Sequence, residues 1–297
     1  MHPFRLSIAA LTAGAILTGA VAWAQADQVL TQPPTLGGGN PGESSARLAA
    51  GYVAPTGPAP RLPNGRVDFS GVWDHPYVPD MSRSNPANPR SQRGAGNLPY
   101  SVAGLQNIQS YDPAKDGDYT GMCMPFGFTR SVNAPYPFQI LQNDRYVAFL
   151  FEQNNWFHVV PFKASHPREL EPTWFGTSIA KWDGDTLVVE TAGFNGFTRL
   201  DTKGNPHSDK LRLTQRFTRT DAGHVAYAVT VDDPVYYSKP WTNERTFTLT
   251  KGGLIEYSCE ENNRSMWEGR IKLWVPPTSE QPRLYKPDAA QPKDSKP

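Results

Sequence analysis

His207 and Asp209 lie two residues apart in a polar segment that also contains Pro206 and Ser208. A histidine near a carboxylate can serve as a general base whose ring the carboxylate orients. Pro206 and Asp209 are also typical of turns, where they fix the backbone and make local hydrogen bonds. The segment therefore supports two interpretations, a catalytic pair and a structural turn, and His207 and Asp209 are our candidate catalytic residues.

A second polar and aromatic segment extends from residue 232 to residue 241. Asp233 belongs to an Asp-Asp-Pro run, and Tyr237 and Trp241 follow it. Paired carboxylates beside a tyrosine can perform acid–base chemistry or bind a hard cation. More often, an Asp-Asp-Pro run simply ends a strand. We expect Asp233, Tyr237 and Trp241 to lie at the same rim of the fold as His207.

The elements that must position these side chains have a period of two. Alternating apolar and polar residues with short turn signals predict a series of antiparallel strands. The predicted strands cover residues 138–141, 145–152, 156–162, 177–182, 185–191, 211–220, 224–231, 244–250 and 254–259. No helical periodicity persists for more than about three turns. The sequence predicts an all-β domain, an antiparallel meander closing into a barrel, with a two-layer sandwich as the alternative.

The phase of these strands places three polar side chains on apolar faces. Gln215 alternates in phase with Leu213 and Phe217, and Arg245 shares its face with Phe247. Glu152 ends a strand whose two faces are both largely apolar. A buried polar group needs a partner, and we expect the 206–209 loop to help provide one for Gln215. The candidate ligand-binding residues are therefore Gln215, Arg245, Glu152, Glu256, Asp233, Tyr237 and Trp241.

Two resemblances follow from longer motifs. The Gly71-Val72-Trp73 tripeptide on a first strand resembles the start of the lipocalin superfamily and implies a barrel that holds an apolar or aromatic ligand. A second resemblance rests on Trp-Asp-Gly-Asp-Thr-Leu-Val-Val-Glu-Thr (182–191), Pro-His-Ser-Asp (206–209), Val-Asp-Asp-Pro (231–234) and Glu-Tyr-Ser-Cys-Glu-Glu-Asn-Asn (256–263). These segments resemble a family of exported bacterial hypothetical proteins, which implies export and a β fold. Gln215 stands where that pattern has an acidic residue, and 161–167 departs from it.

Two cysteines, Cys123 and Cys259, are present. An even pair in an exported protein usually forms a disulfide, and the alternative is a thiol nucleophile or a pair of metal ligands. Without a Cys-x-x-Cys or Cys/His cluster, the sequence favours the disulfide.

The ends of the chain predict export. Residues 1–26 combine a short basic start, an apolar run and a small-residue cleavage site near Ala26, as in a secretory signal peptide. Residues 27–65 are rich in proline and glycine and predict a flexible spacer. Residues 66–275 form the single barrel domain, and 276–297 a disordered tail. We expect a periplasmic or secreted protein without a stable membrane span.

Composition excludes several classes of function. The 297-residue chain has a net charge of +1 and 19% charged residues, which gives no electrostatic basis for binding nucleic acid. Histidine spacing predicts no metal site, and motifs for a serine hydrolase or a nucleotide cofactor are absent from the sequence. The chain is therefore expected to bind a small apolar, aromatic or glycosidic molecule without a cofactor. The alternative is a cofactor-free lyase, isomerase or hydrolase that uses His207, Asp209 and either Glu152 or Glu256. The sequence does not indicate the oligomeric state of the protein.

Overall fold

The computed structural model describes residues 52–85, 92–117, 119–261, 263–272 and 274. The predicted signal peptide, residues 27–51 of the predicted spacer and the predicted tail lie outside these residues. None of the helices that the structure describes is long and apolar enough to cross a membrane.

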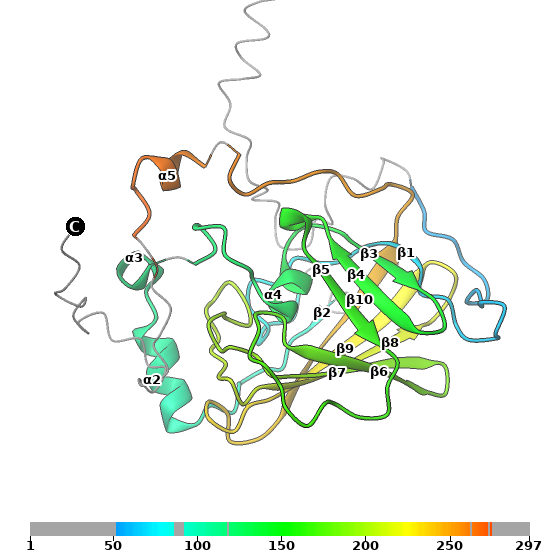
Figure 1. The fold of residues 1–297 in the computed structure, drawn as a ribbon, viewed down its shortest axis with the longest axis horizontal. Helices are drawn as coiled ribbons and strands as arrows, with labels where there is room; N and C mark the ends of the chain where they lie inside the picture. Colours follow the sequence, from blue (N-terminus) through cyan, green and yellow to red (C-terminus); the bar gives the residue numbers. More distant parts are fainter. Residues whose placement is uncertain (1–51, 86–91, 118, 262, 273, 275–297) are drawn as a thin grey trace, which may run out of the picture. The chain divides into compact units, whose positions relative to one another are not determined.

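Nine antiparallel strands form one sheet that nearly closes into a barrel (Figure 1). The strands are β1 (Gly71–Asp74), β3 (Phe138–Gln142), β4 (Tyr146–Phe151), β5 (Phe157–Pro161), β6 (Thr177–Asp183), β7 (Thr186–Ala192), β8 (Arg212–Arg219), β9 (His224–Asp232) and β10 (Trp241–Leu249). Each strand lies beside its neighbours in the chain, and β10 returns to β1 through Trp73↔Leu249. The short β2 (Gln92–Arg93) pairs with β10. The predicted all-β meander closing into a barrel is confirmed.

The seam of the barrel lies between β5 and β6. Alternating directions around nine strands leave these two strands parallel to each other. Where the two strands meet, just after β5, there is an isolated parallel bridge between Phe162 and Ala180, with a hydrogen bond of 3.3 Å from the Lys163 N–H to the Ala180 carbonyl. The other strand pairs have antiparallel ladders. The seam is therefore the least hydrogen-bonded part of the wall.

Aromatic side chains fill the interior of the barrel. The rings of Phe149, Phe217, Tyr227 and Phe247 are buried and contact one another, with centroids 4.8 Å apart for Tyr227 and Phe247 and 5.4 Å apart for Phe149 and Phe217. Trp73 is fully buried on β1. Tight aromatic contacts of this kind supply much of the stability of such a core.

The two ends of the barrel differ. At the turn end, the tight turns 143–145, 184–185 and 220–223 connect consecutive strands. At the loop end, the longer connections 75–137, 193–211 and 233–240 gather, together with η1 (Gln153–Asn155) between β4 and β5. The first of these connections carries α2 (Val102–Ser110), α3 (Pro113–Asp116) and α4 (Phe128–Asn133). The loop end therefore has far more chain from which to build a site.

The segment 52–70 packs on the turn end. Arg61 forms a two-pronged ion pair with Asp185 on the β6–β7 turn, with distances of 3.0 and 2.6 Å. The Ala222 N–H donates to the Gly57 carbonyl at 2.9 Å, and the Tyr52 hydroxyl donates to the Leu249 carbonyl at 2.9 Å. Although the composition of residues 52–65 favours a spacer, these residues make specific contacts with the barrel.

The chain after β10 does not form the predicted hairpin. Residues 252–258 are irregular, and the short helix α5 (Arg264–Trp267) follows. The expected strand at 254–259 is therefore wrong: Ile255 and Glu256 are exposed, and β10 already has β1 and β9 on its two sides. The segment is held by the disulfide between Cys123 and Cys259, which confirms the predicted pairing.

Candidate functional site

His207 is buried at the loop end, in the connection between β7 and β8. Its Nε2 lies 2.6 Å from the Thr198 hydroxyl, and its Nδ1 lies 3.1 Å from the Ser208 carbonyl. Asp209 instead faces Lys210, with an ion pair of 3.5 Å, and is 38% exposed. The structure therefore does not bring Asp209 to the His207 ring, because the Asp209 side chain points toward solvent.

The carboxylate that organises this loop is that of Asp233. Its Oδ1 accepts hydrogen bonds from the Ser208 hydroxyl at 2.9 Å and from the Val235 N–H at 3.0 Å, and its Oδ2 accepts one from the Ser208 N–H. These bonds fasten the 206–211 loop to the turn after β9. Asp233 and Ser208, the residue after His207, thus meet at one rim. The contacts of Asp233 are those of a structural anchor.

Tyr237 and Trp241 complete the same rim. The Tyr237 hydroxyl donates to the Pro206 carbonyl at 2.9 Å. The Tyr237 ring stacks on Tyr100 with a centroid distance of 5.5 Å and meets Trp241 edge to face at 5.4 Å. Burial raises the pKa of the Tyr237 hydroxyl well above its ordinary value, so this group stays protonated and acts as a hydrogen-bond donor.

Gln215 and Arg245 lie inside the barrel, as their strand phases predict. The Tyr227 hydroxyl donates to the Gln215 side-chain carbonyl at 2.7 Å, so Gln215 is bonded by its neighbour on β9 and not, as expected, by the 206–209 loop. Arg245 donates to the side-chain oxygens of Asn133 and Asn243, the latter at 2.8 Å. Burial lowers the pKa of Arg245 to about 10, which leaves a buried cation at neutral pH.

The two candidate glutamates, Glu152 and Glu256, are both associated with the segment that follows β10: Glu152 contacts it and Glu256 belongs to it. Glu152 is buried, and its Oε2 accepts a hydrogen bond from the Ile255 N–H at 3.1 Å. Glu256, which follows Ile255 in the chain, is exposed. Glu152 thus helps to hold the irregular segment 252–258 against the barrel.

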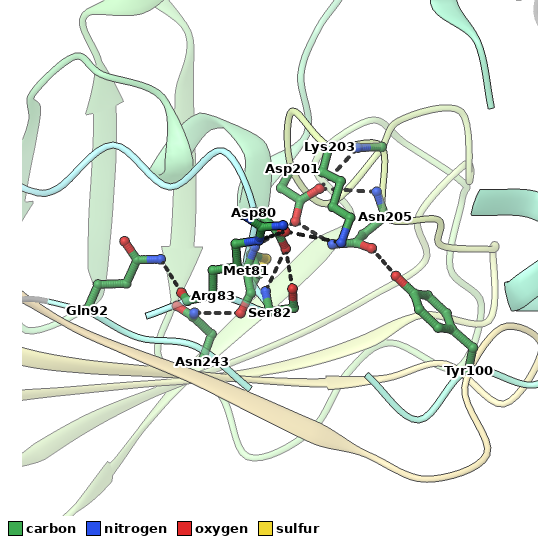
Figure 2. A network of polar contacts seen from close by, with 11 residues as sticks. Asp80, Met81, Ser82, Arg83, Gln92, Tyr100, Asp201, Lys203, Asn205 and Asn243 are labelled. Carbon is green, nitrogen blue, oxygen red and sulfur yellow. Dashed lines mark hydrogen bonds and ion pairs between the residues drawn. The ribbon is translucent and has the colours of Figure 1, made fainter. Parts of the chain in front are cut away.

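A polar network that the sequence analysis missed lies at the loop end around Asp201 (Figure 2). The fully buried Asp201 carboxylate accepts hydrogen bonds from the Met81 N–H at 2.8 Å, the Asn205 N–H at 3.1 Å and the Asn205 side-chain amide at 2.6 Å. The Tyr100 hydroxyl donates to the Asn205 side-chain oxygen. Burial raises the pKa of Asp201 despite these bonds. The network fixes the 80–85 loop to the 193–211 loop.

Asp80 forms the outer part of this network, and Figure 2 shows it beside Lys203. Its Oδ1 accepts from the Ser82 N–H at 2.9 Å, and its Oδ2 pairs with Lys203 at 3.1 Å and Arg83 at 3.2 Å. Burial alone would raise the pKa of Asp80, but the bonds from Ser82 and Lys203 outweigh it and lower the pKa. Asp80 is therefore a carboxylate at neutral pH, with two cations beside it.

A pocket of about 530 Å³ opens beside this network. Its lining combines an aromatic ring, hydroxyl and amide groups and three charged side chains: Tyr77, Pro79, Asp80, Arg83, Ser84, Asn85, Gln92, Thr202 and Lys203. The volume falls in the range of small-molecule sites. No spacing in the sequence pairs Asp80 with Lys203, because the two residues are more than a hundred positions apart.

Comparisons with known proteins give no relative from which a function could be transferred: no family model, curated protein or solved structure matched the chain. Within the described part of the chain, no three histidine, cysteine, aspartate or glutamate side chains gather as a metal site would require.

Proposed function

We propose that this protein binds a small hydroxylated molecule, such as a sugar ring or a glycoside, in the pocket beside Asp80 and Lys203. The observation that carries the proposal is the pocket of about 530 Å³ at the loop end of the barrel. Inside the barrel, the aromatic side chains of the core pack against one another. This packing favours a binding site at the rim over one in the interior.

The chemistry of the lining favours hydroxylated ligands among the classes that the sequence left open. Tyr77 and Pro79 offer an apolar surface of the kind on which a sugar or aromatic ring can lie. Asp80 can accept hydrogen bonds, and Lys203 and Arg83 can donate them. Two or three directional polar groups around an apolar face are typical of specific small-molecule sites.

The support behind the pocket is suited to binding. Asp201 joins the two loops that carry Asp80 and Lys203 through hydrogen bonds to main-chain N–H groups. The Tyr77 hydroxyl lies 3.0 Å from the Thr202 hydroxyl, which holds the ring in the pocket wall. A preformed wall lowers the conformational entropy that the protein's side chains and loops lose when a ligand binds.

A thermal-shift screen tests this proposal. The probes are p-nitrophenyl glycosides and the matching free monosaccharides, applied to wild type, Tyr77→Ala and Tyr146→Ala. Tyr146 is a matched control, since it is 38% exposed on β4. We expect a probe at 100 times its Kd to stabilise wild type and Tyr146→Ala by about 2.7 kcal/mol and to lose this effect in Tyr77→Ala. Equal stabilisation of all three proteins, or of none of them, would contradict the proposal.

We also propose that the protein is exported to the periplasm or beyond the cell. The disulfide between Cys123 and Cys259 supports this proposal, because such bonds persist in oxidising compartments. N-terminal sequencing of protein recovered from a periplasmic extract should begin near Asp27. An intact Met1 on the mature protein would contradict export by signal cleavage.

A further inference from the structure

A chain of three polar side chains spans the seam of the barrel. The His158 Nε2 lies 2.7 Å from the Ser178 Oγ, and the Ser178 Oγ lies 2.7 Å from the Thr191 Oγ1. These residues come from β5, β6 and β7, respectively. Ser178 and Thr191 are buried, with exposed fractions of 3% and 1%. A histidine and a serine thus meet where the backbone ladder of the barrel is interrupted.

The surroundings of His158 keep its ring fixed and uncharged. The ring stacks on Phe175 at a centroid distance of 5.7 Å and contacts Phe128 at 4.9 Å. Burial lowers the pKa of His158 to about 4. The imidazole is therefore neutral at physiological pH, and one of its nitrogens is free of a proton.

A second pocket, of about 210 Å³, opens at the same place. His158 and Ser178 both line it, together with Lys163, Gly176 and Thr177. Lys163 has no ion-pair partner among the residues that the structure describes. Residues that carry a hydroxyl, an imidazole and an ammonium group therefore border one small pocket.

We propose that Ser178 is a nucleophile toward small esters and that His158 is its general base. The Ser178 hydroxyl donates to the His158 Nε2, while the Thr191 hydroxyl donates to the Ser178 Oγ and orients it. The Oγ forms a bond to the ester carbonyl carbon, and its proton moves to Nε2. The bond from that carbon to the alkoxy oxygen then breaks, and the proton passes to the leaving alcohol.

Water completes the reaction by the same steps. A water molecule gives a proton to Nε2 and forms a bond to the acyl carbon, and the acid leaves as Ser178 regains its proton. The sum is ester plus water giving acid plus alcohol, so no further reactant is needed. Lys163 is the cation available to the negative oxygen of the tetrahedral intermediate. This activity is separate from the proposed binding at the loop end, since no residue lines both pockets.

The test uses a fluorophosphonate probe, which bonds to an activated serine with loss of fluoride. Wild type is incubated with the probe, digested and analysed by mass spectrometry. We expect one adduct, on the peptide that contains Ser178, and none on that peptide in Ser178→Ala. His158→Gln can keep a hydrogen bond to Ser178 but supplies no base, and it should slow labelling about 100-fold, the usual size of a general-base contribution.

Two controls separate the proposal from a purely structural role for the cluster. His224→Gln removes a histidine that bonds Asp221 at the turn end and should label as fast as wild type. Thr198, which contacts His207 as Ser178 contacts His158, should carry no adduct. If the substitutions at the seam prevent folding, the position of the adduct in wild type still decides the question. An unlabelled wild type, an adduct elsewhere, or equal rates in wild type and a folded His158→Gln would overturn the assignment.

Discussion

At the scale of single residues, Arg245 is a buried cation that donates its hydrogen bonds to neutral oxygens. Two asparagine side chains accept them, and the guanidinium also lies 5.2 Å from the centre of the Tyr227 ring. Arg245→Ala would leave these buried acceptors without their donor and open a cavity. We expect the free energy of unfolding, measured with urea, to fall by about 3 kcal/mol. Arg212→Ala, at an exposed position on β8, should change it by less than about 0.5 kcal/mol, and equal effects would contradict this account.

His75 makes stability depend on pH. It is buried beside Phe138 and Phe247, and burial lowers its pKa to about 4. The unfolded chain binds the proton nearer pH 6.5, so the contribution of His75 is complete above pH 6.5 and is lost as pH falls toward 4. At pH 4.5 we expect His75 to lower the free energy of unfolding by about 2–3 kcal/mol relative to pH 7. The measurement is urea unfolding at both pH values.

The matched variant for this prediction is His75→Gln, which has no titrating ring. Because His158 and several carboxylates also respond to acid, the decisive quantity is the difference between the two proteins. The loss of stability between pH 7 and pH 4.5 should be smaller in His75→Gln by that same 2–3 kcal/mol. The same loss in both proteins would assign the pH dependence to other groups.

Strand phase predicts which residues face inward but does not predict their partners. Gln215 and Arg245 lie inside the barrel because each alternates in phase with buried apolar neighbours. His158 shares its phase with Val160, so its inward position could have been found in the same way. Its contact with Ser178 depends on how two strands without a shared ladder meet. Asp80 and Asp201 had no such signal, because both lie in loops.

At the scale of elements, β5 has a full ladder of backbone hydrogen bonds on one side only. It has a ladder with β4, whereas its other side meets β6 at the seam. Since alternate N–H groups of a strand point to opposite sides, about half of the β5 amides should exchange with solvent quickly. We expect hydrogen–deuterium exchange to show this, with β9 protected along its length because it pairs with both β8 and β10. Equal protection of β5 and β9 would mean that the seam is closed.

The disulfide anchors the segment 252–272, which follows the last strand of the barrel. Apart from this bond, the segment 252–272 is held by hydrogen bonds such as Asn155 to Tyr257 at 3.0 Å and Asn263 to Gly121 at 2.9 Å. We expect the double variant Cys123→Ser, Cys259→Ser to keep the circular dichroism of the barrel. Limited proteolysis should then cut it within 252–272, where wild type resists. Loss of the strand signal would instead show that the bond is needed for the barrel.

Eight of the nine predicted strands correspond to observed ones, because alternation and turn residues are local signals. The prediction for 254–259 failed since β10, the strand it would have paired with, has no free side: β1 and β9 already flank it. The start of β10 at Trp241 was missed because Pro240 reads as part of a loop. The short helices of the 75–137 connection are too brief to show a period.

At the scale of the whole molecule, the chain before β1 contributes to stability. Residues 52–65 supply the Gly57 carbonyl for Ala222 in the β8–β9 turn and the Pro60 carbonyl for Asp68, which directly precedes β1. A chain that begins at Arg66 loses both bonds, worth about 1 kcal/mol each, and should melt roughly 5 °C lower than a chain that begins at Tyr52. Calorimetry checks this difference, and identical melting temperatures would show that the segment only lies on the surface.

The direction of the β5–β6 pair follows from parity, and this limits how such a barrel can change. A hairpin inserted anywhere adds two strands of opposite direction, so the total stays odd and one parallel pair must remain. Removing β5 alone would place β4 beside β6 in opposite directions, and an antiparallel ladder could then run around all eight strands. The present seam and the pocket that opens at it therefore exist because the number of strands around the barrel is odd.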